Sequence, residues 1–281
     1  MEILFMGTSA AEGWPALFCA CEHCRRAVEA GGKNIRTRPS VLVDGSILVD
    51  PGPDLYLHTL RYDLRLADLD GFVVTHAHLD HLAAGEFHFT GPPFSHRDMD
   101  RPLPIWANAE ALEWIRQAVR CDDDQEIRRS FGLELHLARP GEPFEIGACT
   151  ITPLLANHVE DQQCLFYHFE SDGKTYLQAN DTGYFPEATW TWLQGRVLDA
   201  ISLDCTNGRL GGYDSHLGVD GVIDVVERLR KQGQLAPSAR AIATHFSHNG
   251  GLLHHELEAA LNPHGIEVAY DGMRAVIGHQ R

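Results

Sequence analysis

GFVVTHAHLDH, residues 71–81, is the stretch that decides the fold we expect. It places three histidines and one aspartate within six positions, directly after a short apolar run. Strand side chains alternate between faces, so His76 and His78 share one side if the backbone is extended, while Asp80 and His81 project from the turn beyond. Four potential metal ligands then surround one small volume. The alternative for Asp80 is an N-cap of a helix that the following HLAAGEFHF suggests.

Three other apolar runs also end on a side chain that can bind a metal. ITPLLAN leads into His158, TYLQAN into Asp181 and AIAT into His245, as GFVVT leads into His76. If these strands lie side by side and point the same way, their ends converge at one sheet edge, where α/β folds commonly build sites. Each residue could instead be an ordinary strand-end polar group, and Asp181 in NDTGY could be a turn aspartate. Their joint presence favours a common metal site.

The composition is that of an ordinary globular chain. It has 281 residues, 44% of them hydrophobic, and one domain over residues 1–281 is the simplest interpretation. The formal net charge of −16 disfavours nucleic acid as a partner, because such affinity comes largely from Lys and Arg. No window approaches the roughly 18–20 apolar residues of a membrane span, and the first residues lack a basic segment followed by a long apolar stretch. We therefore expect a cytoplasmic protein with no membrane partner.

Hydrophobic spacing predicts strands and helices in an irregular succession. Strands are predicted at 2–8, 40–50, 71–76, 104–108, 149–158, 164–171, 175–181, 199–205 and 240–245. Helices are predicted at about 109–119, at 222–229 with a stop at Gly233, and at 253–261 before Pro263. A strand-rich first half followed by mixed strands and helices predicts an α/β fold of two sheets with helices outside, and not a regularly alternating doubly wound fold.

A second metal-binding pattern lies near the start of the chain. FCACEHC supplies Cys19, Cys21 and Cys24 on a loop after the first predicted strand. Seven cysteines and no export signal argue against a disulfide framework, so three thiols this close favour a structural zinc site. The fourth ligand stays open between His23 and a distant histidine, for which THFSHN offers His248. A redox or nucleophilic role for the thiols is the alternative.

THAHLDH resembles the HxHxDH signature of the metallo-β-lactamase superfamily, and SILVDPGPD at 46–54 resembles the family's first motif. The resemblance implies an αββα sandwich with two divalent metals, zinc or manganese. It also implies that Asp50 orients a ligand histidine through the second ring nitrogen of that histidine. The implied ligands are His76, His78 and His158 on one metal, Asp80, His81 and His245 on the other, and Asp181 bridging both.

The cysteine cluster together with THFSH near the C-terminus narrows the resemblance to PhnP-like phosphodiesterases, whose relatives cleave ribosyl cyclic phosphates. This resemblance assigns the fourth zinc ligand to His248 and implies that His216, in YDSHLGVDG, is the general acid. A surface-loop role, or a place beside Ser215 at a helix cap, is equally open for His216. The stretch AAGEFHF departs from the acidic GLDDLR-type stretch of many PhnP-like chains, so substrate preference is open. The PqqB family shares the cysteine cluster but keeps fewer of the active-site ligands, whereas all seven stand here.

We therefore predict a binuclear metal-dependent hydrolase, most simply a phosphodiesterase in which a hydroxide bridging two metals cleaves a small phosphodiester, for example a ribosyl cyclic phosphate. The predicted catalytic residues are Asp80, Asp181 and His216. Thioester, lactone or β-lactam hydrolysis on the same metals is an alternative, and so is a non-catalytic binding or carrier role like that suspected for PqqB. A tRNA-processing nuclease is not expected, because 39 acidic residues stand against 23 basic ones. The predicted partner is a small molecule, and a homodimer is left open.

Overall fold

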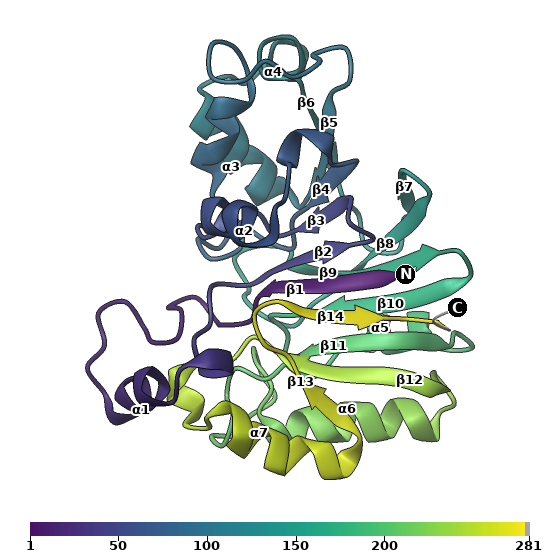
Figure 1. The fold of residues 1–281 in the computed structure, drawn as a ribbon. Coiled ribbons are helices and arrows are strands. Elements are labelled where there is room, and N and C mark those ends of the chain that lie inside the picture. Colours follow the sequence, from purple (N-terminus) through teal and green to yellow (C-terminus); the bar gives the residue numbers. More distant parts are fainter. Residues whose placement is uncertain (279–281) are drawn as a thin grey trace.

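Two seven-stranded sheets face each other, and helices cover both outer surfaces (Figure 1). The structure is a computed structural model and describes residues 1–278. The first sheet has the order β14-β1-β2-β3-β4-β5-β6, formed by β1 (Glu2–Gly7), β2 (Ser40–Val43), β3 (Ile47–Val49), β4 (Gly71–Val73), β5 (Leu103–Ala107), β6 (Leu133–Leu137) and β14 (Met273–Val276). The second has the order β13-β12-β11-β10-β9-β8-β7, formed by β7 (Phe144–Ile146), β8 (Cys149–Leu155), β9 (Leu165–Ser171), β10 (Lys174–Ala179), β11 (Leu198–Asp204), β12 (Leu235–Thr244) and β13 (Ile266–Val268).

Apolar side chains form one core layer between the sheets and one on the outer face of each sheet. Along β1, Ile3 and Phe5 point into the layer between the sheets, while Leu4 points to the outer face, as strand alternation requires. The outer layer of the first sheet is covered by α2 (Leu55–Tyr62), α3 (Ala109–Val119) and α4 (Asp124–Phe131), and that of the second by α5 (Glu187–Leu193), α6 (Val219–Lys231) and α7 (His254–Leu261). The remaining helix, α1 (Glu22–Ala30), adds Cys24 and Ala27 to the core of the second sheet. The predicted α/β fold, an αββα sandwich, is confirmed.

The three helices that the apolar spacing predicts are α3, α6 and α7. On α6, for instance, Val222, Val225, Val226 and Leu229 are all buried against the second sheet. The helix suggested after the histidine stretch is a short 3-10 helix at Ala84–Thr90. Its N-cap position is Ala83, so Asp80 does not serve as a helix cap there.

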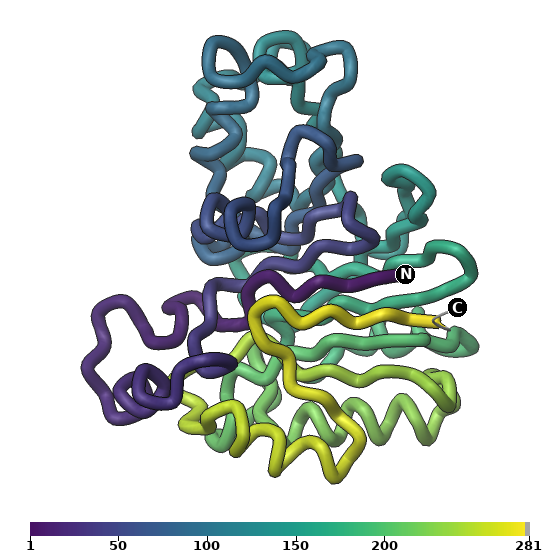
Figure 2. Tube along the Cα trace, viewed as in Figure 1, coloured from purple at the N-terminus to yellow at the C-terminus, as the bar shows by residue number. Residues whose placement is uncertain are grey.

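The path of the chain brings its first and last described strands together and sends one early segment away from the sheets. β14 pairs with β1, which places the last described strand beside the first. Figure 2 shows the segment between β1 and β2 leaving the sandwich as an arm that includes α1. Among residues 1–278, no helix has the length and apolar character that crossing a membrane requires.

A buried histidine far from the predicted metal ligands gives a test of the packing on the second sheet. His168 on β9 is 6% exposed and lies beneath α5, with its ring centre 5.0 Å from that of Trp192. Burial, with a smaller contribution from the charge of Arg196, lowers the pKa of His168 to about 4. The unfolded chain therefore binds a proton at His168 as the pH falls below about 6.5, whereas the folded chain does not until about pH 4.

We expect this histidine to reduce the free energy of unfolding as the pH falls, by about 2 to 3 kcal/mol between pH 7 and 4.5. His168→Phe removes the titrating group and keeps an aromatic ring against Trp192. Urea unfolding of both proteins, loaded with the same metal, gives the free energy of unfolding at each pH. Between pH 7 and pH 4.5 the difference between the two free energies should change by that amount, in favour of the variant. Parallel curves for the two proteins would contradict the expectation.

Candidate metal centre

The four strand ends singled out in the sequence meet at one edge of the sandwich. β4 belongs to the first sheet, and β8, β10 and β12 run in the same direction in the second. In the sheets formed by residues 1–278, no two of these strands are neighbours. The ligands that follow β4 therefore meet those of the other three strands across the layer between the sheets. The backbone turns sharply at this edge, because Asp50, Asp181 and His245 have positive φ angles of 58°, 46° and 60°. Such conformations cost energy in residues other than glycine and concentrate at functional sites.

One group of ligands consists of three histidines. Nε2 of His76 lies 2.8 Å from Nδ1 of His78, and Nε2 of His158 lies 3.2 Å from the same atom. His76 is fully buried, and burial is the largest reason that its pKa lies well below the ordinary value. Burial also lowers the pKa of His158. Neutral imidazoles whose nitrogens meet at one point are suited to bind a metal ion.

The second group joins two carboxylates and two histidines, all buried: Asp80, His81, Asp181 and His245. Nε2 of His245 lies 3.0 Å from Oδ2 of Asp181, and Nε2 of His81 contacts the same oxygen. The other oxygen of Asp181 lies 3.8 Å from Nε2 of His158 in the first group. Asp181 thus stands between the two groups, where a bridging carboxylate would have to be.

The donor atoms of this second group fit divalent metals. Nε2 of His81, Nε2 of His245 and Oδ2 of Asp181 lie close together, but among residues 1–278 these buried atoms form no hydrogen bond with one another or with any other group. Native proteins rarely leave buried polar atoms in that state. Burial opposes a charge on His81, but Asp80, Asp181 and Asp50 outweigh burial and hold the pKa of His81 well above its ordinary value. Carboxylates that attract protons this strongly would also attract a divalent cation. Imidazole and carboxylate ligands together suit zinc or manganese.

Residues behind the ligands hold them in place. Asp50 accepts a hydrogen bond of 2.8 Å from Nδ1 of His81, which turns Nε2 toward the second group. The backbone N–H of Thr75 donates to the other oxygen of Asp50 at 2.8 Å. Gly52 lies so close to the histidine loop that a Cβ atom there would stand 2.1 Å from the carbonyl oxygen of Asp80, so only glycine fits. The resemblance implies that Asp50 orients a ligand histidine, and this histidine is His81.

Asp204 is a site residue that the sequence analysis missed. It ends β11, is fully buried, and accepts a hydrogen bond of 2.9 Å from Nδ1 of His216. The same carboxylate oxygen lies 3.4 Å from Nδ1 of His245 and accepts a bond of 3.0 Å from Thr206. A signal was available, because DAISLD is another apolar run that ends on a potential ligand. His216 itself lies beside the centre, with Nδ1 3.6 Å from Asp181.

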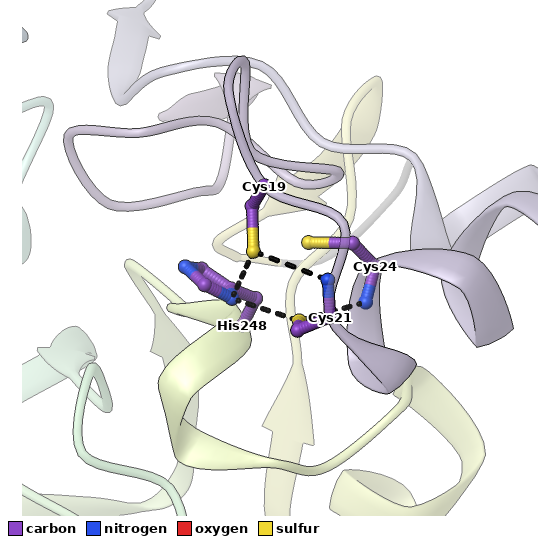
Figure 3. Close-up of side chains that lie close together, drawn as sticks. All are labelled: Cys19, Cys21, Cys24 and His248. Carbon is purple, nitrogen blue, oxygen red and sulfur yellow. Dashed lines mark hydrogen bonds between the residues drawn. The ribbon is translucent and has the colours of Figure 1, made fainter.

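The three cysteines of FCACEHC form a separate group with His248 (Figure 3). Nδ1 of His248 lies 3.4 Å from the sulfur of Cys21 and 3.8 Å from that of Cys19, and all four ligand atoms lie within 4.8 Å of one another. His23 is not part of this group. Figure 3 shows the thiols of the arm facing a histidine that follows β12, so the group joins two distant parts of the chain. Three sulfurs and one imidazole nitrogen fit a tetrahedral structural zinc.

The local backbone favours a thiolate in this group. Cys21 is the N-cap of α1, and its sulfur accepts a hydrogen bond from the backbone N–H of Cys24. That bond, more than any other contact, lowers the pKa of Cys21 to about 6. A thiolate is the form that binds zinc.

Comparison with known proteins identifies the fold family. A family model described as "Beta-lactamase superfamily domain" matches residues 46–246, which is more than half of the chain. The chain belongs to the metallo-β-lactamase superfamily. Together with the buried His and Asp groups, this membership makes the chain a metal-dependent hydrolase of the metallo-β-lactamase fold.

Relatives within the superfamily match nearly the whole length. Coenzyme PQQ synthesis protein B of Klebsiella pneumoniae (strain 342) is 25% identical, over 97% of this chain and 97% of its own. The crystal structure of a diphosphatase from the PhnP family has a TM-score of 0.75 at 24% identity, covering 98% of this chain and 96% of that one. Zinc-bound PqqB from Methylobacterium extorquens also has a TM-score of 0.75, at 17% identity, covering 99% and 100%. At these identities the two structural likenesses show the fold alone.

Proposed function

We propose that this member of the metallo-β-lactamase superfamily hydrolyses a small phosphodiester. The observation that carries the proposal is the joining of the two ligand groups through Asp181, with the pair His216 and Asp204 directly beside it. Two divalent metals bound by these groups would lower the pKa of a water molecule and neutralise charge on the phosphoryl oxygens, which is the chemistry that phosphoester hydrolysis needs.

The residues of the chain have distinct roles in this proposal. His76, His78 and His158 would hold one metal, Asp80, His81 and His245 the other, and Asp181 both. Asp204 holds Nδ1 of His216 at 2.9 Å, which leaves Nε2 of that half-exposed ring to donate a proton to the leaving oxygen. Asp50 fixes the ring of His81, while Asp204 and Thr206 fix that of His245.

A second candidate function is a part in coenzyme PQQ synthesis. It is favoured by the relative from Klebsiella pneumoniae, which matches 97% of this chain. It includes the non-catalytic carrier role considered above. The two candidates differ in what the second ligand group does, since a carrier does not need Asp80, His81 and His245 to support turnover.

Metal analysis combined with turnover tests the proposed function. We expect about three metals per purified chain, two in the centre and one on the cysteines, and hydrolysis of bis(4-nitrophenyl) phosphate. Asp80→Ala should lower both the metal content and the rate. One metal per chain with no turnover, or equal turnover in the variant, would contradict the phosphodiesterase and favour the carrier role.

The role of His216 can be tested by varying the leaving group. His216→Gln should lower kcat by on the order of 10²-fold or more for an alkyl leaving group, which needs a proton. For 4-nitrophenolate, a stable anion, the loss should be less than about tenfold. Metal content should be unchanged, and His255→Gln on the exposed surface of α7 serves as the control. Equal losses for both leaving groups would show that His216 does not act as the acid.

A further inference from the structure

A hollow of about 630 Å³ opens beside Asp80 and is not used by the mechanism above. Its wall contains apolar side chains from three parts of the chain: Pro53, Leu79, Ala83, Ala84 and Trp114. Leu79 lies inside the histidine signature, between His78 and Asp80, and yet is 76% exposed. Leu79 and the proposed ligand Asp80 therefore border the same hollow. A second apolar hollow, of about 260 Å³ beneath α2, has none of the proposed ligands in its wall.

The described residues around the hollow beside Asp80 offer no free positive charge. Among residues 1–278, Arg38 is the one Lys or Arg that lines this hollow. The guanidinium of Arg38 donates two hydrogen bonds, of 2.6 and 2.7 Å, to the carboxylate of Asp54, and the backbone N–H of Arg38 donates a third of 2.8 Å. This fork-to-fork pairing satisfies the charge of Arg38 within the chain. A second phosphate on a substrate would therefore find no partner among these residues.

We infer that the hollow binds an uncharged apolar substituent of the ester, with an aromatic ring against Trp114 as the best fit. The inference rests on the proposed function and deepens it, because it names the class of substrate: phosphodiesters with one organic group that is apolar, and without a second phosphate. A group in the hollow borders Asp80, so it lies next to the second ligand group. Aromatic rings bury a large apolar area when they stack, so an aromatic substituent would gain the most binding energy from contact with Trp114.

Binding of two phosphodiesters that differ only in their substituents tests the inference apart from turnover. Diphenyl phosphate and dimethyl phosphate carry the same single charge. Titration calorimetry with the zinc-loaded protein should show diphenyl phosphate binding at least roughly tenfold more tightly, because only its ring reaches apolar surface. Equal affinities, or binding of neither compound, would overturn the inference.

Substitutions in the wall of the hollow test whether the preference for diphenyl phosphate arises there. Trp114→Ala and Ala84→Asp should each reduce the preference for diphenyl phosphate to less than about threefold, and Trp114→Ala should leave the affinity for dimethyl phosphate unchanged. Ala84→Asp adds a charge at a half-buried surface position, so it provides the answer if Trp114→Ala fails to fold. Leu60→Ala, an exposed leucine on α2 outside the hollow, is the matched control. An unchanged preference in both wall variants would contradict the assigned place.

The same protein preparation separates this inference from the proposed function. Selective binding of diphenyl phosphate without hydrolysis of bis(4-nitrophenyl) phosphate would support the apolar hollow and contradict the phosphodiesterase. Hydrolysis without selective binding would do the reverse. The diphosphatase of the PhnP family, which this fold resembles, makes a diphosphate ester a useful third ligand, and we expect it to bind no more tightly than dimethyl phosphate.

Discussion

Replacing Asp181 with asparagine is expected to lower turnover of a phosphodiester by on the order of 10³-fold or more and to remove metal from both ligand groups. Asparagine keeps the volume of the side chain and tolerates the left-handed backbone at this position, where φ is 46°. It removes the charge that stands between the two groups, 3.8 Å from His158 and 3.0 Å from His245. The loss should therefore come from the centre and not from misfolding.

A matched control lies at the other end of the same strand. Asp172 precedes β10 as Asp181 follows it, has a φ of 50°, and is exposed. Asp172→Asn should keep both metal content and turnover, because it changes an aspartate in the same backbone conformation outside the centre. Plasma emission analysis and initial rates on both variants give the answer. Full metal content in Asp181→Asn would contradict the bridging role.

The residues that the sequence could locate are those with a repeated local signal. The run GFVVTHAHLDH carries alternation, a turn and four ligands in eleven positions, so its place at a strand end follows from local geometry. The long apolar strands and the helices α3, α6 and α7 are visible for the same reason, because one face of each is buried.

Elements that local reasoning missed have little of this signal. α4 buries Ile127 alone and α1 buries only Cys24 and Ala27, so neither shows an apolar stripe. On α2 the apolar residues Tyr56, Leu57 and Leu60 are exposed, which blurs the spacing. β7 and β13 have three residues each, too few for a period of two to be recognised.

The parts of the site that could not be predicted depend on distant packing. Asp204 and His216 are twelve residues apart in the chain, and their hydrogen bond exists only because a loop folds back over the end of β11. The convergence of β4 with β8, β10 and β12 depends on how two sheets are placed face to face. Alternation within each strand carries no information about that placement, so the family resemblance had to supply the assignment of ligands to each metal.

The cysteine group should prove to be structural. Cys21→Ser is the sharpest test, because serine is itself a favoured N-cap and can keep the hydrogen bond to the N–H of Cys24 while removing the thiolate. We expect one metal fewer per chain and a free energy of unfolding lower by about 3 kcal/mol or more, since the binding energy of a structural zinc is folding energy. Cys121→Ser, a half-buried cysteine outside the group, should change neither quantity.

Turnover decides between this role and a redox or nucleophilic one. The segment that carries His245 is held independently of the zinc ligands, because Phe246 bonds through its backbone to Thr8 at 2.9 Å and to Ala10 at 3.0 Å. Cys21→Ser should therefore keep most of its turnover at temperatures well below its lowered Tm. Thermal unfolding and initial rates, measured on the same samples, distinguish the two roles. A variant with unchanged Tm but no turnover would place the thiols in the chemistry, whereas a variant that loses zinc and stability while still turning over substrate would confine them to the fold.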